Sequence, residues 1–200
     1  AYELFNSYGF RCFYQNLEPN QIIWLDDESV IADVGHSIGL ERYLKGYQFE
    51  IIKKVNLAEI PKAHKRYAEL LYAELCKAGR YAEIAALISK LNAHAAKPKI
   101  DNLTHFSLSH EEHAFLEHLS RETDVFSLNH KTIEWQTEAD RVLIAGGWLE
   151  VLTADLLRGN NMRDIHLSVE IGKSTQRKKS KTFQEIDVMA MKQQKLVIIE

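Results

Sequence analysis

The sequence predicts a mixed α/β fold, with strands toward both ends and helices between them. Residues 10–34 contain short apolar stretches separated by the turn-forming pairs Pro19-Asn20 and Asp26-Asp27, which is typical of consecutive antiparallel strands. Residues 56–97 carry apolar side chains at helical spacing, and residues 164–200 return to strand-like alternation. These three patterns indicate sheets at both ends of the chain, joined by a helical middle.

The first region, residues 1–55, resembles the closing part of a larger sheet. It contains three expected strands, then a helix and one further short strand. The helix has Leu40, Tyr43 and Leu44 on one face, at the i, i+3, i+4 spacing of an amphipathic helix. The expected bounds are Phe10–Leu17, Gln21–Leu25 and Ser29–Val34 for the strands, Ile38–Gly46 for the helix and Phe49–Lys53 for the last strand.

The middle region, residues 56–136, is expected to be a helical connector. Two helices end near Gly79 and before Pro98, as helices commonly do at such residues. A third helix begins at Ser109, which forms a capping box with Glu112. The two strands that follow it are Val125–Leu128 and Thr132–Trp135. A helix followed by a two-stranded wing predicts a winged-helix-like unit.

Three histidines on that third helix permit two interpretations. His110, His113 and Glu117 are spaced at i, i+3, i+7 and, with His118 nearby, could converge on a metal. Alternatively they form the exposed polar face of an amphipathic helix. We favour the exposed face, because the string His-Glu-Glu-His lacks the i, i+4 histidine spacing of zinc proteases.

The last region, residues 137–200, contains charges that a purely structural segment would avoid. Trp148–Leu157 is apolar on nearly every side, as in a helix buried in a core, yet Glu150 stands between Leu149 and Val151. The helix dipole favours a glutamate in the first turn, which explains its tolerance but not its placement. Because an ionised carboxylate in apolar surroundings is costly unless it is paired or binds a metal, we favour a functional role for Glu150.

Two more acids are expected to meet across a tight hairpin. The strands at 184–192 and 195–200 are separated by only two residues, which sets Asp187 opposite Glu200. Directly opposed side chains have Cβ atoms about 4.5–5.5 Å apart, and like charges there are destabilising. Glu185 shares the face of Asp187, because side chains two apart on a strand point the same way. The same alternation assigns the opposite, core-facing side to Ile186, Val188 and Ala190.

Glu150, Asp187 and Glu200, with Glu185 as a supporting acid, form a candidate metal site. Hard oxygen ligands of this kind suit Mg²⁺ or Mn²⁺. Such an ion lowers the pKa of a bound water and stabilises the charge that develops on a phosphate under attack. The pattern therefore predicts phosphodiester hydrolysis in which the first three acids are catalytic.

A cationic loop precedes the hairpin. The whole chain has a net charge of −3, so a run of cations without an acid among them indicates a local polyanion contact rather than a generally basic surface. A solvated turn is the alternative interpretation. Beside an acidic cluster we favour nucleic-acid binding, because a polyanionic substrate needs cations near the metal. The cations are Lys173, Arg177, Lys178, Lys179 and Lys181.

Composition and the chain ends indicate the setting. Cys12 and Cys76 follow no metal or redox spacing, which favours a reduced, cytoplasmic compartment. No stretch approaches the roughly 18 apolar residues of a membrane span, and the start of the chain has no signal-peptide pattern. The chain begins at Ala1 within an expected helix and stops within an expected strand, so we expect a segment of a longer protein.

Three stretches of the last region resemble the motifs of PD-(D/E)XK nucleases. They are Gly146-Gly147-Trp148-Leu149-Glu150, Gln184-Glu185-Ile186-Asp187 and Leu196-Val197-Ile198-Ile199-Glu200. More narrowly, they resemble CRISPR-associated ancillary nucleases that carry an N-terminal CARF sensor domain. The resemblance is specific over residues 144–200 and weaker elsewhere. It implies that the three regions are the end of a Rossmann-like CARF sheet, a winged-helix-like connector and a PD-(D/E)XK nuclease domain.

The same resemblance implies an activity and its regulation. Proteins of this family are homodimeric, metal-dependent endonucleases that cut DNA or RNA when cyclic oligoadenylate activates them in type III CRISPR antiviral defence. Two departures matter: Gln184 stands where the family has asparagine, and the motif lysine would fall two residues beyond Glu200. Two alternatives stay open, a non-catalytic nucleic-acid-binding or scaffold protein with a degenerate nuclease fold, and a repair or restriction nuclease without a nucleotide activator.

Overall fold

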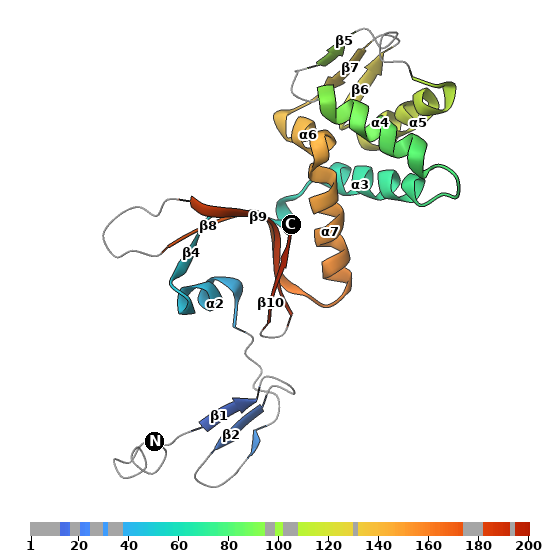
Figure 1. The fold of residues 1–200 in the computed structure, drawn as a ribbon. Coiled ribbons are helices and arrows are strands. Elements are labelled where there is room, and N and C mark those ends of the chain that lie inside the picture. Colours follow the sequence, from blue (N-terminus) through green and yellow to red (C-terminus); the bar gives the residue numbers. More distant parts are fainter. Residues whose placement is uncertain are drawn as a thin grey trace, which may run out of the picture.

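The computed structural model describes residues 13–16, 21–24, 30–31, 38–94, 99–101, 108–129, 132–173, 182–192 and 195–200. In this part of the chain three antiparallel β-sheets and several helices are defined (Figure 1). The mixed α/β fold expected from the sequence is therefore confirmed. No helix among these residues has the length and apolar character needed to cross a membrane.

The N-terminal sheet is a three-stranded meander in the order β1-β2-β3. Its neighbouring strands are antiparallel, with Phe13 opposite Trp24 and Ile23 opposite Val30. The strands are β1 (Phe13–Asn16), β2 (Gln21–Trp24) and β3 (Val30–Ile31), each within a range that the sequence predicted.

A four-stranded antiparallel sheet contains the end of the chain, in the order β10-β9-β8-β4. The long strands β8 and β9 form its centre, and β10 and β4 lie on either side of them (Figure 1). The strands are β4 (Phe49–Asn56), β8 (Arg163–Lys173), β9 (Thr182–Lys192) and β10 (Lys195–Ile199).

Strand β4 pairs with a strand from the last region of the chain. The sequence placed residues 1–55 apart from residues 137–200, but β4 is paired with β8 along its length. Helix α2 (Leu40–Gly46) packs on the same sheet. The physical reason is burial, because Leu40 and Leu44 are covered only when they pack with apolar side chains of β8 and β9. Residues 38–56 therefore belong structurally with the C-terminal strands.

The helical middle packs on the other side of the C-terminal elements through one large apolar cluster. Leu71 of α3, Leu87 of α4 and Leu116 of α5 are each buried in this cluster, which continues into α7 and the four-stranded sheet. The helices and strands of the helical middle are η1 (Leu57–Glu59), α3 (Lys62–Leu75), α4 (Tyr81–His94), β5 (Lys99–Asp101), α5 (His110–Thr123), β6 (Phe126–Asn129) and β7 (Thr132–Trp135).

Helix α5 and the hairpin β6-β7 form the helix-and-wing layout that the sequence predicted. The Ser109 hydroxyl oxygen accepts a hydrogen bond from the Glu112 amide at 3.0 Å, and the Ser109 amide donates one to the Glu112 carboxylate at 2.7 Å, which confirms the capping box. Strand β5 adds a third strand in the order β5-β7-β6. His110 and His118 are exposed on α5, and His113 lies 3.6 Å from Glu117, which supports the exposed-face interpretation.

The segment that leads to Glu150 contains a π-helical turn between two α-helices. Helix α6 (Glu138–Val142) runs through a π-helical turn, η3 (Leu143–Gly147), into α7 (Trp148–Gly159). Gly146 has φ +137°, a conformation that L side chains rarely adopt. A Cβ at Gly147 would lie 3.1 Å from the Val142 carbonyl oxygen. Both glycines are therefore needed to turn the chain tightly into α7.

Candidate functional site

The C-terminal hairpin has the register that the sequence predicted. Ile199 of β10 lies opposite Val188 of β9. Glu200 directly follows the end of β10, so the same register, extended by one residue, would set it opposite Asp187. The predicted pairing of these two acids across the hairpin is thus consistent with the strand register.

Helix α7 brings Glu150 to the same place. Glu150, Asp187 and Glu200 all line one cavity of about 190 Å³, which we call the acid cavity. Glu150 comes from α7, Asp187 from β9 and Glu200 from the residue that directly follows β10. The other lining residues are Gly146, Leu149, Thr153, Val188 and Ile199.

Glu150 is half-buried and directed toward the sheet. Ser168 of β8 donates a hydrogen bond from its Oγ to Glu150 Oε2 at 3.1 Å. Burial raises the pKa of Glu150 above its ordinary value, whereas the Ser168 hydrogen bond lowers it; the negative charges of Asp187 and Glu185 raise it further. The carboxylate therefore lies in a region of like charge that one hydroxyl only partly offsets.

Near Ser168, alternate side chains of β9 no longer point to the same side of the sheet. The strict alternation expected for β9 is therefore wrong here. Ile186 packs in the cluster that contains α2, but Val188 and Ala190 pack in the cluster that contains α7. On the neighbouring strand Ser168 has φ +46°, an uncommon value for a residue other than glycine. The backbone irregularity there is the physical reason that a period of two fails along this part of the sheet.

The donor chemistry of the acid cavity fits a hard divalent cation. All three acids supply carboxylate oxygens, the ligands that Mg²⁺ and Mn²⁺ prefer. Glu200 now accepts a hydrogen bond from Gln184 Nε2 at its Oε1, at 2.6 Å. Among the described residues no three His, Cys, Asp or Glu side chains are arranged to hold a metal ion. Closing the three carboxylates on one ion would therefore require Glu200 to rotate away from Gln184.

The remaining predicted site residues are less closely placed. Glu185 is exposed and lies opposite Glu170 of β8, outside the lining of the acid cavity. Lys173 is exposed at the end of β8, opposite Phe49. The other four predicted cations, Arg177, Lys178, Lys179 and Lys181, lie outside the described residues.

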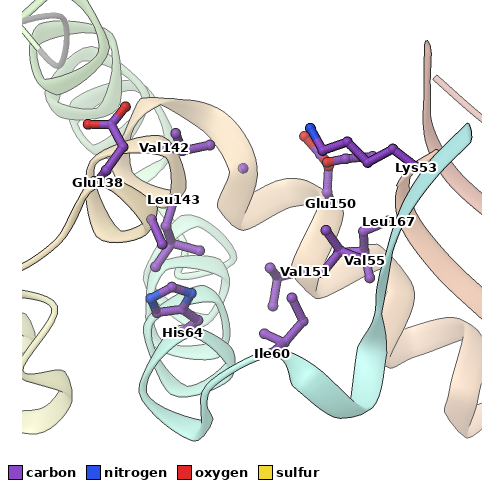
Figure 2. A pocket seen from close by; sticks show the side chains of 13 residues that line it. Lys53, Val55, Ile60, His64, Glu138, Val142, Leu143, Glu150, Val151 and Leu167 are labelled. Atoms are coloured by element: carbon purple, nitrogen blue, oxygen red, sulfur yellow. The ribbon is translucent and has the colours of Figure 1, made fainter. Parts of the chain in front are cut away.

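Sequence reasoning missed a second cavity on the other side of Glu150. This cavity, of about 460 Å³, has mostly apolar walls and we call it the apolar cavity. Figure 2 shows Lys53 extending from β4 toward Glu150 at its rim, while Val55, Val151 and Leu167 form its wall. Ser168 also lines it. No sequence signal singled out Lys53 or Ser168, because both residue types are ordinary in exposed strands.

His64 of α3 lines the far wall of the apolar cavity (Figure 2). Its Nε2 lies 2.7 Å from Asp140 Oδ1, and both side chains are buried. Thr137 donates from its Oγ1 to Asp140 Oδ2 at 2.6 Å and caps α6. Asp140 thus has a partner for each carboxylate oxygen, unlike the acids of the acid cavity.

Comparisons with known proteins match this part of the chain to an endonuclease. Residues 136–200 match the family described as Card1-like, endonuclease domain. No curated protein is similar enough to match the chain. Among solved structures, protein VC1899 from Vibrio cholerae has a TM-score of 0.76 at 20% identity, over 100% of this chain and 53% of that one.

A second solved structure has the same fold. It is Can2 from Sulfobacillus thermosulfidooxidans in complex with cyclic tetra-adenylate, with a TM-score of 0.64 at 20% identity, over 100% of this chain and 52% of that one. The chain therefore spans about half the length of the solved structures that it matches. At this identity the likeness establishes the mixed α/β fold.

Proposed function

We propose that this chain carries the active site of a metal-dependent endonuclease of the PD-(D/E)XK type. Glu150, Asp187 and Glu200 would hold Mg²⁺ or Mn²⁺ and hydrolyse phosphodiester bonds of DNA or RNA. The observation that carries the proposal is the convergence of these three acids on one cavity. It falls within residues 136–200, which match an endonuclease domain.

The bound ion would activate a water and stabilise negative charge on the phosphate. The chain itself performs the positioning. The Ser168 hydroxyl orients one oxygen of Glu150, and Gln184 holds Glu200 until a cation competes for it. Leu149 and Ile199 supply apolar surface to the lining of the acid cavity, which lowers the local dielectric and strengthens electrostatic interactions there.

Regulation by a cyclic oligoadenylate is the second part of the proposal. The resemblance to CARF-containing CRISPR nucleases implies it, and the shared fold with a cyclic tetra-adenylate-bound protein supports it. The activator would bind the complete protein, as a homodimer, and raise the rate of cleavage. Binding energy that differs between the inactive and active conformations would supply the coupling.

The proposal is tested with Asp187→Ala and Glu200→Ala in the complete protein. We expect each substitution to lower cleavage at least 100-fold, because removing a metal ligand removes the charge stabilisation it supplies. EDTA should abolish cleavage and Mn²⁺ should restore it. The measurement is the cleavage rate of labelled single- and double-stranded DNA and RNA, with cyclic tetra-adenylate added.

Asp155→Ala is the matched control, because Asp155 also lies on α7 but pairs with Arg158 outside the acid cavity. Unchanged cleavage in Asp187→Ala would contradict the proposed site. Nucleic-acid binding without any cleavage would favour the non-catalytic alternative. Equal rates with and without cyclic tetra-adenylate would favour a nuclease that needs no nucleotide activator.

A further inference from the structure

We infer that Lys53 is a substrate-binding residue, which contacts a backbone phosphate of the nucleic acid beside the acid cavity. The inference rests on the proposed nuclease function and adds a residue from β4, outside the segment that matches the endonuclease family. The ligand is a polyanionic strand, DNA or RNA, and the contact is one phosphate group.

The first observation is that the two cavities share Glu150. Glu150 lines the acid cavity together with Asp187 and also lines the apolar cavity together with Lys53. Figure 2 shows the Lys53 side chain running from β4 toward the Glu150 carboxylate. A strand whose scissile phosphate occupies the acid cavity would therefore pass Glu150 and bring a neighbouring phosphate to Lys53.

The second observation is the sign of the surrounding charge. Asp187 and Glu185 act on Glu150 as negative charges, and Glu170 and Glu185 face each other across β8 and β9. Among the described residues that line the two cavities, Lys53 is the one lysine or arginine. A phosphate backbone approaching this acidic surface is repelled unless a cation offsets the charge.

The third observation is that the ion pair of Lys53 with Glu170 is exposed and weak. Its Nζ lies 3.4 Å from Glu170 Oε1, and 63% of its side chain is exposed. Exposed ion pairs of this kind contribute about 0–1 kcal/mol, so a phosphate can compete for the amino group. Lys54, the next residue, is less exposed at 27% and makes a shorter contact of 2.8 Å with Glu41.

The fourth observation is the strand itself. The register between β4 and β8 shifts on both sides of Lys53, between Ile51 and Lys53 and again between Lys53 and Val55. Such irregularities re-aim a side chain and are over-represented next to active sites. At Lys53 the irregular register accompanies a side chain that reaches the rim of the apolar cavity.

The test compares Lys53→Gln with Lys54→Gln in the complete protein. Binding of a labelled single-stranded DNA, and of the RNA of the same sequence, is measured in Ca²⁺ over a series of salt concentrations. We expect Lys53→Gln to weaken binding about tenfold at low salt, as for the loss of one charge-assisted hydrogen bond. The slope of the logarithm of the binding constant against the logarithm of the salt concentration should become less steep by about one unit, as for the loss of one phosphate contact.

The control Lys54→Gln should leave both quantities unchanged, and Lys53→Arg should restore the slope. Thermal melting of each variant shows whether the fold is kept. A Lys53→Gln variant with wild-type affinity and slope would overturn the inference. Binding is measured without cleavage, so an inactive protein that still loses a phosphate contact in Lys53→Gln would contradict the nuclease function alone. Wild-type protein that binds neither strand would contradict both.

Discussion

Asp140 of α6 and Glu150 of α7 differ in how the negative charge of each carboxylate is satisfied. Asp140 is buried, and each of its oxygens has a partner in His64 or Thr137. Glu150 is only half-buried and lies near Asp187, another acid, with one hydroxyl as its partner. The first arrangement neutralises an acid within the fold, and the second leaves negative charge available.

This difference shows how structural and functional acids can be told apart. A buried charge that serves stability needs a counter-charge and hydrogen bonds within the protein. Acids that lie close together without a cation raise the free energy of the folded state. Such a cluster is therefore a candidate binding site for a cation. The Lys90–Glu112 pair, at 2.9 Å, belongs to the first kind. The acid cavity belongs to the second.

The largest expected effect is the difference in the free energy of unfolding between a variant that lacks Asp140 and one that lacks Asp187. Asp140→Ala should lower the free energy of unfolding by about 3 kcal/mol or more, because it leaves His64 buried without its partner. Asp187→Ala should leave that free energy unchanged or slightly higher, because it removes a like charge from the neighbourhood of Glu150. Urea denaturation of both variants measures the difference. Equal destabilisation would break the comparison.

A smaller effect is expected at Ser168, where glycine would favour stability but the serine hydroxyl would favour activity. A residue other than glycine at φ +46° costs about 1–2 kcal/mol, so Ser168→Gly should raise the free energy of unfolding by up to about 1 kcal/mol. The same variant loses the hydroxyl that orients Glu150 and should cleave more slowly. Denaturation and cleavage assays are run together.

Ser168→Ala separates the two causes in that experiment. It removes the hydroxyl but keeps a Cβ at the strained position, so it should cleave as slowly as Ser168→Gly without the gain in stability. Wild-type cleavage in both variants would show that Ser168 has no positioning role for Glu150.

The smallest expected effect extends the comparison to histidine. His64 has a carboxylate partner, whereas the buried Nδ1 of His166 has no hydrogen-bond partner among the described residues. Burial lowers the pKa of His166 below 6.5 and Lys54 lowers it further, although Asp164, Glu41 and Glu59 raise it. The unfolded chain therefore binds the proton more readily than the folded one.

Stability from this neutral histidine is present above about pH 6.5 and is lost as the pH falls through the lower folded value. The midpoint of thermal unfolding should decrease over that interval. His166→Phe should reduce this decrease, because the variant has no imidazole to protonate. An identical pH profile in the variant would assign the loss to other groups.

The hairpin and the cap were predictable because each depends on local spacing. The short gap between β9 and β10 determines which residues face each other, and so the register from Lys195 opposite Lys192 to Ile199 opposite Val188 could be predicted. Ser109 and Glu112 are three residues apart, and their capping box forms within one helical turn. No distant part of the chain is needed for either feature.

Other parts of the site depend on tertiary contacts that sequence periodicity does not report. A count of alternate residues assumes a regular strand, and it fails at Ser168 because a serine seldom adopts a positive φ. The partner of β4 could not be read from its own residues, since strand pairing across the helical middle is set by packing on α2.

The pairing of β4 with β8 has a consequence for how the protein is made. β4 ends at Asn56, and β8 begins only at Arg163, more than a hundred residues later. At about 5–20 residues per second of synthesis, β4 leaves the ribosome about 5–20 seconds before its partner. The helical middle has more local contacts and can fold within that interval. Until β8 arrives, the edge of β4 and the apolar face of α2 lack the partner that covers them in the folded protein, which favours association with other chains.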